Sequence, residues 1–569
     1  MAVRETRPVL LHEIIELAAS DRPDDTALVV PGRRLSYGEF DRRVRSMARW
    51  LEQVVQPGDR VLLVSDNHMD VVTALYAVPA TGAILAFGNT RHTPEELLEL
   101  FDAVEPTVVV ASVEQLERIA DRIVDRDAIA GSNTRLFGLG GTHPAAELDL
   151  TSFLDAAALQ GDALDAAALD AAPAADGPHH GADQDDCAWL IHTSGTTGRP
   201  KGVMLTHRGL VAAVLNTAVS RPLADDDVYL FPFPLFHVAA YNVLHAQLRR
   251  RPVVLVPRFD AGQLLSLIEE EQVTVCSLAP TMIAMLLDHA DRADRAGSAD
   301  LAGSSDHAAS AGRVGHSAGP LGRLRQISYG ASSMPLALLR RVLDELPGCG
   351  LGQGYGMTEL SGNAVFLSPE EHRRAASDSP PLLAAAGRPG PLVAVRIVDD
   401  DDEDLDVQPG EPGEVLVRGD QVCAGYWNDP VATAESRLGE WFRTGDIGRI
   451  GADGELYIVD RKKDLIITGG ENVASREVAD MISEHPDVAR VAVVGIPDER
   501  WGETVCAVVV PAASAPEPDA DAIIRWSDGR LAGFKRPRVI LFVEDLPVNA
   551  SGKVDKRLVR TLALSNLTD

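Results

Sequence analysis

The ten residues from Thr193 to Gly202, TSGTTGRPKG, combine three glycines and four hydroxyl side chains with one Arg and one Lys. Glycine lets backbone N–H groups come close to phosphate oxygens, while the hydroxyls and Lys201 add donors and positive charge. Apolar residues 187–192 precede the stretch and a helix-like run at 207–219 follows it, so we expect a loop that joins a strand to a helix. The stretch is not a Walker loop, because Pro200 stands where that motif has glycine before its lysine. Its residue types favour a phosphate-binding loop over an ordinary flexible turn.

Six further stretches follow in the chain: PLFHVAA (234–240), YGAS (329–332), GQGYGMTE (352–359), WFRTGD (441–446), YIVDRKKDLIITGGEN (457–472) and PVNASGKVDK (547–556). With the first stretch, continued to His207, they resemble the signature motifs of the adenylate-forming superfamily, in the same order. That superfamily contains the acyl-CoA synthetases, the firefly luciferases and the adenylation domains of non-ribosomal synthetases. The resemblance covers nearly the whole chain.

The resemblance implies a two-step reaction with ATP, Mg²⁺ and coenzyme A as cofactors. A carboxylate attacks the α-phosphate of ATP and gives an acyl-adenylate and pyrophosphate, and the thiol of coenzyme A then displaces AMP. Carboxylate and triphosphate repel each other, so the site must supply cations and oriented donors where charge develops.

The resemblance also implies a role for each matching residue. Lys553 would reach the substrate carboxylate and the α-phosphate, Thr358 would contact the α-phosphate and Glu359 would hold Mg²⁺. The phosphate loop would hold the β- and γ-phosphates through Thr193, Ser194, Gly195, Thr196, Thr197, Gly198 and Lys201. The adenine would lie against Gly330, Ala331, Ser332, Gly354, Tyr355, Gly356 and Met357, with Tyr355 stacked on the ring. Asp446 would accept hydrogen bonds from the ribose hydroxyls, as a carboxylate with two oxygens can, and Arg461 would lie near the ribose and phosphate.

Three further positions concern the thiol step. Lys463 matches the hinge about which the small domain rotates between the two half-reactions. Gly469 and Gly470 would line the pantetheine tunnel, where a side chain would block the thiol. His237 resembles the gate between this tunnel and the acyl pocket, although a buried core histidine is the alternative. One departure stands beside these matches: where many relatives have Tyr-Pro, this chain has Ala474 and Ser475.

The elements that must position these residues alternate along the chain. Strand-like runs at 60–67, 107–113, 252–257 and 273–280 are separated by helix-like runs at 93–104 and 261–271. This alternation predicts an α/β fold with largely parallel sheets. The helix-like run at 333–346 has Ser and Pro near its start. Residues 71–87 are uncharged, but they contain Pro79 and Gly82 and are too short to span a membrane, so we expect a buried helix followed by a strand.

The pattern predicts two domains. Residues 1–461 would form a large N-terminal domain of several subdomains, with mixed, largely parallel sheets, and residues 462–569 a small mobile α+β domain. Two Ala- and Asp-rich segments, about 155–186 and 288–319, have few large apolar residues and are expected to be mobile surface insertions. Their histidines have no metal-ligand spacing, and residues 399–406 read as a solvated turn rather than a calcium loop.

The composition of the chain disfavours several classes of function. The chain has 569 residues, 53 Lys and Arg against 84 Asp and Glu, and a net charge of −31. Such a charge disfavours binding to nucleic acid or to an anionic membrane. The five cysteines form no paired motif, and Cys276 and Cys506 lie in apolar runs, which is typical of reduced core residues in a cytoplasmic protein.

The sequence therefore predicts an ATP-dependent acyl-CoA ligase for a hydrophobic carboxylic acid, either fatty or bulky and alicyclic. No Asp follows Phe236 and His237 to bind an α-amine, which disfavours an amino-acid substrate. Three alternatives remain: an enzyme that performs one half-reaction only, an enzyme that loads a carrier protein instead of coenzyme A, and a nucleotide-binding protein without activity. A homodimer also stays open.

Overall fold

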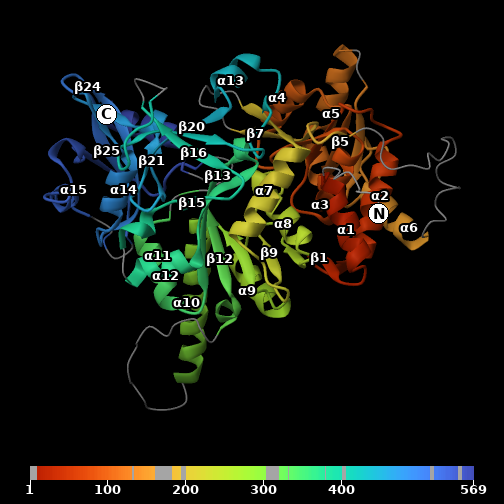
Figure 1. Cartoon of the computed structure of the whole chain (residues 1–569), viewed down its shortest axis with the longest axis horizontal. Coiled ribbons are helices and arrows are strands. Elements are labelled where there is room, and N and C mark those ends of the chain that lie inside the picture. Colours follow the sequence, from red (N-terminus) through yellow and green to blue (C-terminus); the bar gives the residue numbers. More distant parts are fainter. Residues whose placement is uncertain are drawn as a thin grey trace, which may run out of the picture.

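The structure is a computed structural model that describes residues 9–130, 133–160, 182–193, 200–302, 319–330, 332, 334–377, 380–399, 405–512, 515, 518–548 and 554–568. The described strands form four sheets, of seven, nine, five and five strands (Figure 1). The predicted α/β class with large, largely parallel sheets is confirmed. Among the described residues, no helix is both long and apolar enough to cross a membrane.

The seven-stranded sheet has the order β18-β8-β7-β4-β3-β5-β6. Its central strands run parallel, while β8 and β18 extend one edge antiparallel to β7. The strands are β3 (Arg60–Val64), β4 (Ile84–Phe87), β5 (Val108–Ser112), β6 (Arg135–Leu139), β7 (Cys187–Thr193), β8 (Lys201–Thr206) and β18 (Gly425–Tyr426).

The nine-stranded sheet has the order β15-β14-β13-β12-β11-β9-β10-β1-β2. It is parallel from β1 to β13, and β2, β14 and β15 add antiparallel edges. The strands are β1 (Thr26–Val30), β2 (Arg33–Ser36), β9 (Tyr229–Phe231), β10 (Val253–Leu255), β11 (Val275–Leu278), β12 (Gln326–Gly330), β13 (Gly350–Met357), β14 (Gly362–Leu367) and β15 (Arg388–Pro389).

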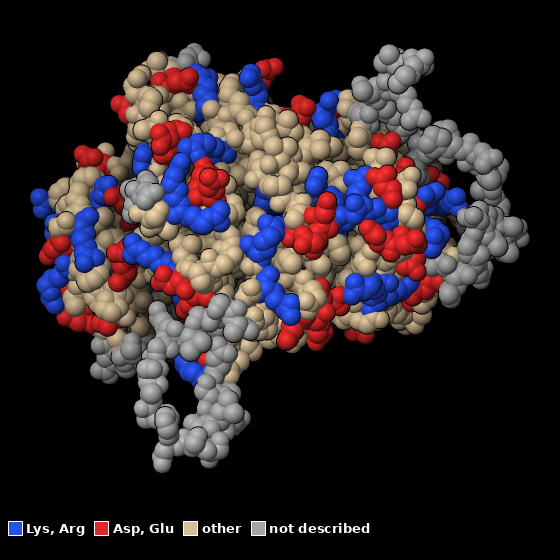
Figure 2. Space-filling view, turned by 60° about the horizontal axis from the view of Figure 1, so that its bottom comes forward, with Lys and Arg blue, Asp and Glu red and all other residues tan. Residues whose placement is uncertain are grey.

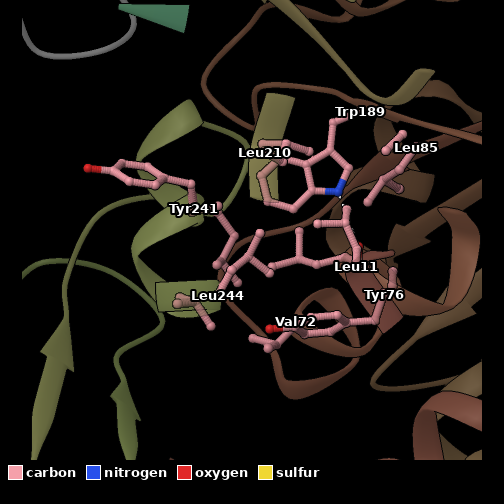
Figure 3. Packing of buried hydrophobic residues seen from close by; sticks show 14 of the residues in the cluster. Leu11, Val72, Tyr76, Leu85, Trp189, Leu210, Tyr241 and Leu244 are labelled. Atoms are coloured by element: carbon pink, nitrogen blue, oxygen red, sulfur yellow. Dashed lines mark hydrogen bonds between the residues drawn. The ribbon is translucent and has the colours of Figure 1, made fainter. Parts of the chain in front are cut away.

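Helices fill the space between these two sheets and cover their outer faces. The inner helices are α1 (Leu11–Asp21), α2 (Tyr37–Leu51), α3 (Met69–Ala80), α7 (His207–Ser220) and α8 (Tyr241–Leu248). In the shared core, Leu11 lies between Trp189 and Tyr76, and the indole of Trp189 donates a hydrogen bond to the carbonyl of Leu75 at 3.1 Å (Figure 3). The buried helix and strand predicted for residues 71–87 are confirmed as α3 and β4, which are buried throughout.

The outer helices begin and end as the sequence signals indicate. Helix α4 (Pro94–Val104) starts with a capping box, in which Thr93 accepts from the Glu96 N–H at 3.2 Å and Glu96 accepts from the Thr93 N–H at 2.8 Å. The other outer helices are α5 (Val113–Ala130), α6 (Leu150–Gln160), α9 (Ala261–Glu270), α10 (Pro280–Ala302), α11 (Leu336–Glu345), α12 (Pro369–Ser377) and α13 (Pro430–Glu435).

The two Ala- and Asp-rich segments begin in helices, and their mobility stays a prediction. Helix α6 continues to Gln160 and α10 to Ala302, and their acidic residues bind arginines elsewhere in the chain. Asp155 pairs with Arg33 and Arg43, and Asp288 pairs with Arg341 at 2.6 Å. Alanine has a high helix propensity even where little apolar surface is buried, which accounts for these helical parts. The remainder of both segments, at 161–181 and 303–318, lies outside the described residues.

The two five-stranded sheets follow near the end of the chain. One contains β16 (Ala394–Val398), β17 (Gly413–Arg418), β19 (Arg437–Leu438), β20 (Trp441–Ile450) and β21 (Leu456–Arg461), all antiparallel. The other contains β22 (Ile466–Thr468), β23 (Glu471–Val473), β24 (Val488–Asp498), β25 (Gly502–Pro511) and β26 (Val539–Phe542). Helices α14 (Ser475–Ser483) and α16 (Lys556–Thr568) pack on this last sheet, with α15 (Ala520–Trp526) nearby.

Charged side chains of both signs are interspersed over the face shown in Figure 2. Many of the acids are paired, as in the contacts of Arg126 with Asp102 and of Arg135 with Glu147. Cys276 and Cys506 are buried and unbonded, as the sequence predicts, and the other three cysteines are also free.

Candidate active site

The site residues gather around the end of β13 and the turn that follows it. This turn is a short 3₁₀ helix, η5 (Thr358–Leu360), so Tyr355 and Glu359 lie in consecutive elements. Strand β13 belongs to the nine-stranded sheet, and in Figure 1 it lies in the middle of the molecule, beside β20 and β16. Side chains from three sheets therefore meet at this point.

The first cluster joins Tyr355, Asp446 and Arg461. The Tyr355 hydroxyl donates a hydrogen bond to Asp446 Oδ2 at 2.7 Å, and Arg461 Nε lies 3.5 Å from Asp446 Oδ1. Asp446 on β20 and Arg461 on β21 are opposite each other in register, which explains their proximity. Burial raises the pKa of Asp446, and it does so against the opposing effects of Arg461 and Tyr355.

The second cluster joins Lys201, Tyr426 and Glu359. The Tyr426 hydroxyl donates to Glu359 Oε1 at 3.2 Å, and Lys201 Nζ lies 4.9 Å from the centroid of the Tyr426 ring. Burial raises the pKa of Glu359, while Arg461 lowers it and Asp446 raises it. Tyr355 ends β13 and Glu359 lies in the turn η5 that follows it, so the two clusters adjoin each other in one site.

The phosphate-loop stretch lies between two strands and not between a strand and a helix. Thr193 at the end of β7 is opposite Lys201 at the start of antiparallel β8, and α7 begins only at His207. The expectation was wrong because the six residues from Lys201 to Thr206 form a strand that extends the sheet edge. Residues 194–199, which include Ser194, Gly195, Thr196, Thr197 and Gly198, lie outside the described residues.

Glycines bring the backbones at the predicted adenine wall close together. A Cβ on Gly330 would lie 2.6 Å from the Gly354 carbonyl oxygen, and one on Gly354 would lie 2.1 Å from Asn363 Nδ2. Gly330 therefore faces backbone that leaves no room for a side chain, whereas a side chain at Gly354 would displace that of Asn363. Gly356 and Met357 continue β13 in register with β14, Thr358 is buried and Ser332 is exposed, while Ala331 lies outside the described residues.

The residues expected to serve the thiol step lie in turns. Gly469 and Gly470 have φ angles of +62° and +84° and join β22 to β23, so the hairpin itself requires glycine there. Lys463 is exposed in a 3₁₀ turn, η7 (Lys462–Asp464), between β21 and β22. His237 is partly exposed and directly precedes the 3₁₀ turn η2 (Val238–Ala240). The hinge, tunnel and gate roles of these residues stay predictions.

Lys553 lies outside the described residues, but the ends of its loop are described. Val548 and Val554 form an antiparallel bridge, and the Asp555 N–H donates to the Pro547 carbonyl at 2.9 Å. Both valines are about half exposed. Residues 547–548 and 554–555, on either side of Lys553, are therefore paired with each other directly before α16 begins.

Sequence reasoning missed Tyr426, which contacts two of the predicted site residues. Its strand, β18, is only two residues long and pairs with β8, with Tyr426 opposite Val203. The only signal in the sequence is the Gly-Tyr pair in CAGYWNDP (423–430). The contact depends on a strand pairing that brings distant residues together, so no local pattern indicates it.

The residues fit a bound Mg²⁺ ion on chemical grounds. Glu359 is a carboxylate whose charged form is disfavoured by burial, and a nearby divalent cation would offset this penalty. Carboxylate and hydroxyl oxygens are the protein ligands that Mg²⁺ prefers. Among the described residues, no group of three or more His, Cys, Asp and Glu side chains is arranged to hold a metal by itself. The phosphates of a nucleotide would therefore have to supply most of its remaining ligands.

The family model of the AMP-binding enzymes matches residues 15–427, and that of the AMP-binding enzyme C-terminal domain matches residues 477–553. The chain is 35% identical over 541 residues to a feruloyl-CoA synthase from an Amycolatopsis species, covering 95% of this chain and 96% of that protein. It is 33% identical over 559 residues to an indoleacetate–CoA ligase from Aromatoleum aromaticum, covering 97% and 98%.

The fold is similar to that of a solved relative with a bound intermediate. The o-succinylbenzoate-CoA synthetase from Bacillus subtilis, in complex with its acyl-adenylate, superposes with a TM-score of 0.74 at 25% sequence identity. The match covers 97% of each chain. The likeness therefore extends over both the AMP-binding region and the C-terminal region.

Proposed function

Because the chain belongs to the AMP-binding enzyme family and is an AMP-forming acid–thiol ligase of the acyl-CoA synthetase type, we propose that it activates a hydrophobic, ring-bearing carboxylic acid. An oxygen of the acid forms a bond to the α-phosphorus of ATP, and pyrophosphate leaves. The sulfur of coenzyme A then forms a bond to the acyl carbon, AMP leaves, and the thiol proton passes to solvent.

The observation that carries this proposal is the meeting of two clusters at the end of β13. Tyr355, Asp446 and Arg461 offer an aromatic ring, a hydrogen-bond acceptor and a cation, which suit adenine, ribose and phosphate. Lys201 and Glu359, joined through Tyr426, suit the phosphates and their metal ion. A bound Mg²⁺ would neutralise charge on the phosphate oxygens.

Two observations support the choice of a ring-bearing acid. Residues 238–240, Val-Ala-Ala, follow His237 and are small and apolar, which suits a bulky uncharged acyl group. Ferulate and indoleacetate, the acids named for the two relatives, each carry an aromatic ring. We infer that a ring system, aromatic or alicyclic, fits better than a short acid such as acetate.

The test measures each half-reaction separately. Acid-dependent exchange between ATP and pyrophosphate, with a panel of short, linear and ring-bearing acids, reports adenylation. Thioester formation from synthetic acyl-adenylates and free coenzyme A reports the second step. We expect ring-bearing acids to support exchange most strongly and free coenzyme A to be sufficient as acceptor. Exchange with acetate alone would refute the choice of acid, and a requirement for a carrier protein would refute coenzyme A as acceptor.

Lys553 provides a decisive variant, because its ammonium group is proposed to act in adenylation only. Lys553→Ala should lower exchange by at least 100-fold, as expected for loss of a charged group in the transition state. Thioester formation from the acyl-adenylate should largely be retained. Lys535→Ala is the matched control, since Lys535 lies in the same region and pairs with Glu477 at 2.7 Å. If exchange survives in Lys553→Ala, the assignment of this lysine is wrong.

A further inference from the structure

Tyr426 stands between a cation and a carboxylate that do not touch each other. Its ring faces Lys201 Nζ at 4.9 Å, and its hydroxyl donates to Glu359 Oε1 at 3.2 Å. No ion pair within 4.0 Å joins Lys201 to Glu359, or either of them to another charged side chain that the structure describes. Among the described residues, Tyr426 is the side chain that has a ring contact or hydrogen bond with both groups.

The backbone around Tyr426 holds its side chain in this place. Tyr426 is paired with Val203 on β8, two residues after Lys201, and its N–H donates to Thr433 Oγ1 at 2.9 Å. The carbonyl of Glu359 accepts from the Cys423 N–H at 2.8 Å. Both ends of the contact are therefore fixed by backbone hydrogen bonds from the same short segment, residues 423–426.

We propose that Tyr426 is a positioning residue that sets the spacing between Lys201 and Glu359 for a magnesium-bound triphosphate. The face of the ring attracts the ammonium group, and the hydroxyl occupies one carboxylate oxygen. A direct ion pair between Lys201 and Glu359 would instead occupy both charged groups, and neither would be available to the ligand. With the Tyr426 side chain in contact with both groups, Lys201 remains available to phosphate, and the second oxygen of Glu359 remains available to the metal.

This proposal rests on the proposed function, but binding measurements can test it without turnover. Tyr426→Phe keeps the ring and removes the hydroxyl, whereas Tyr426→Leu removes both contacts. The matched control is Tyr457→Phe, because Tyr457 has the same two contacts elsewhere: its hydroxyl donates to Glu455 at 3.2 Å and Arg449 lies 4.2 Å above its ring. Calorimetry with ATP plus Mg²⁺, ATP plus EDTA, pyrophosphate plus Mg²⁺, and AMP gives the readouts.

We expect Tyr426→Phe to weaken binding of ATP with Mg²⁺ about tenfold, equivalent to about 1.4 kcal/mol. Binding of ATP in EDTA and of AMP should stay within about twofold of wild type, because neither involves the metal and the second lacks the outer phosphates. Tyr426→Leu should in addition weaken pyrophosphate binding, because the lysine is no longer held.

Three results would overturn the spacing role. One is an unchanged affinity for ATP with Mg²⁺ in Tyr426→Phe, and another is an equal loss for AMP, which would indicate general disturbance of the site. The third is a loss of the same size in Tyr457→Phe. The wild-type protein could bind ATP with Mg²⁺ while none of the acids supports exchange between ATP and pyrophosphate. In that case the proposed function fails, and the binding data still decide the role of Tyr426.

Discussion

At the scale of single residues, the site contains two carboxylates whose charged form is less favourable in the folded protein than in the unfolded chain. Burial raises the pKa of both Asp446 and Glu359 above their ordinary values. A raised pKa in the folded state means that ionisation of the group opposes folding, and this penalty grows as pH rises through the pKa. Carboxylates with perturbed pKa values are concentrated at functional sites. There the binding of a ligand depends on a charge whose burial opposes folding.

Asp446→Asn should therefore separate stability from binding. We expect the melting temperature to stay the same or rise, because a buried charge is removed. The affinity for AMP should fall about 10- to 100-fold, since hydrogen bonds to charged groups are worth about 1.5–3 kcal/mol. Differential scanning fluorimetry and calorimetry with AMP measure the two effects.

Glu440→Gln serves as the control for Asp446→Asn. Glu440 is a strongly exposed acid that directly precedes β20 and pairs with Arg418 at 3.2 Å, so its substitution should change neither quantity. A lower melting temperature in Asp446→Asn, with AMP affinity retained, would show that the carboxylate serves the structure and not the nucleotide.

At the scale of elements, an ion-pair network joins α2, α3 and α6 beneath the seven-stranded sheet. Arg43 Nε lies 2.6 Å from Asp70 Oδ1, and both side chains are almost fully buried. Arg43 also contacts Asp155, and Thr151 donates to Asp70 at 2.8 Å. Burial acts to raise the pKa of Asp70, but hydrogen bonds from His68 and Arg43 outweigh it and lower the pKa from 3.8 to about 2.

Removal of one partner from this pair should destabilise the N-terminal region strongly. Arg43→Met or Asp70→Leu alone should reduce the free energy of unfolding by about 3–5 kcal/mol, because a buried charge is left unpaired. The double variant should lose clearly less than the sum of the two. Urea unfolding, followed by tryptophan fluorescence, gives the three values, and additive losses would contradict coupling between the two side chains.

The pH dependence of this pair has a defined sign. Because the pKa of Asp70 is lowered on folding, its contribution to stability is present above pH 3.8 and is lost as pH falls from about 3.8 to 2. Wild type should therefore lose stability in this window more steeply than the double variant, which lacks the group.

Elements and motifs differ in how far the sequence predicts them. Strands such as β3 and β5 were predictable, because apolar β-branched runs have a clear period and clear ends. Strand β8 was not, since residues 201–206 are short and form one edge of the sheet through pairing with β7 and with the distant β18. The place of Tyr426 in the site depends on this same pairing. Likewise, Asp155 on α6 and Asp288 on α10 pair with arginines far away in the sequence, and no local apolar pattern indicates these contacts.

At the scale of the whole molecule, a polar cluster joins the last sheet and its helices to the rest of the chain. The Ser475 hydroxyl donates to Asp460 Oδ2, and Lys556 Nζ donates to Ser475 Oγ. Lys556 also lies 3.6 Å from Asp460 and 3.5 Å from Asp464. Asp460 belongs to β21, whereas Ser475 and Lys556 begin α14 and α16, at the end of the molecule drawn in blue in Figure 1.

This cluster lies across the predicted hinge at Lys463, so rotation about that residue would separate Asp460 from Ser475 and Lys556. The hydroxyl belongs to Ser475, one of the two residues that depart from the Tyr-Pro of many relatives, and proline could supply no such bond. The contacts should therefore stabilise the present domain arrangement over the alternative one. A mutation shifts an equilibrium between two arrangements only if it changes their relative stability. Because these contacts stabilise the present arrangement, their loss should favour the alternative one.

Ser475→Ala should move the two half-reactions in opposite directions. A hydrogen bond to a charged group is worth about 1.5–3 kcal/mol, so its loss should change the ratio of the two arrangements about 10- to 100-fold. Single-turnover rates of adenylation and of thioester formation from acyl-adenylate measure the two populations. Ser483→Ala is the control, since its hydroxyl on the same helix donates only to the Asp480 carbonyl at 2.7 Å. If Ser475→Ala slows both steps in parallel, the cluster supports folding of the C-terminal region and does not select between the two arrangements.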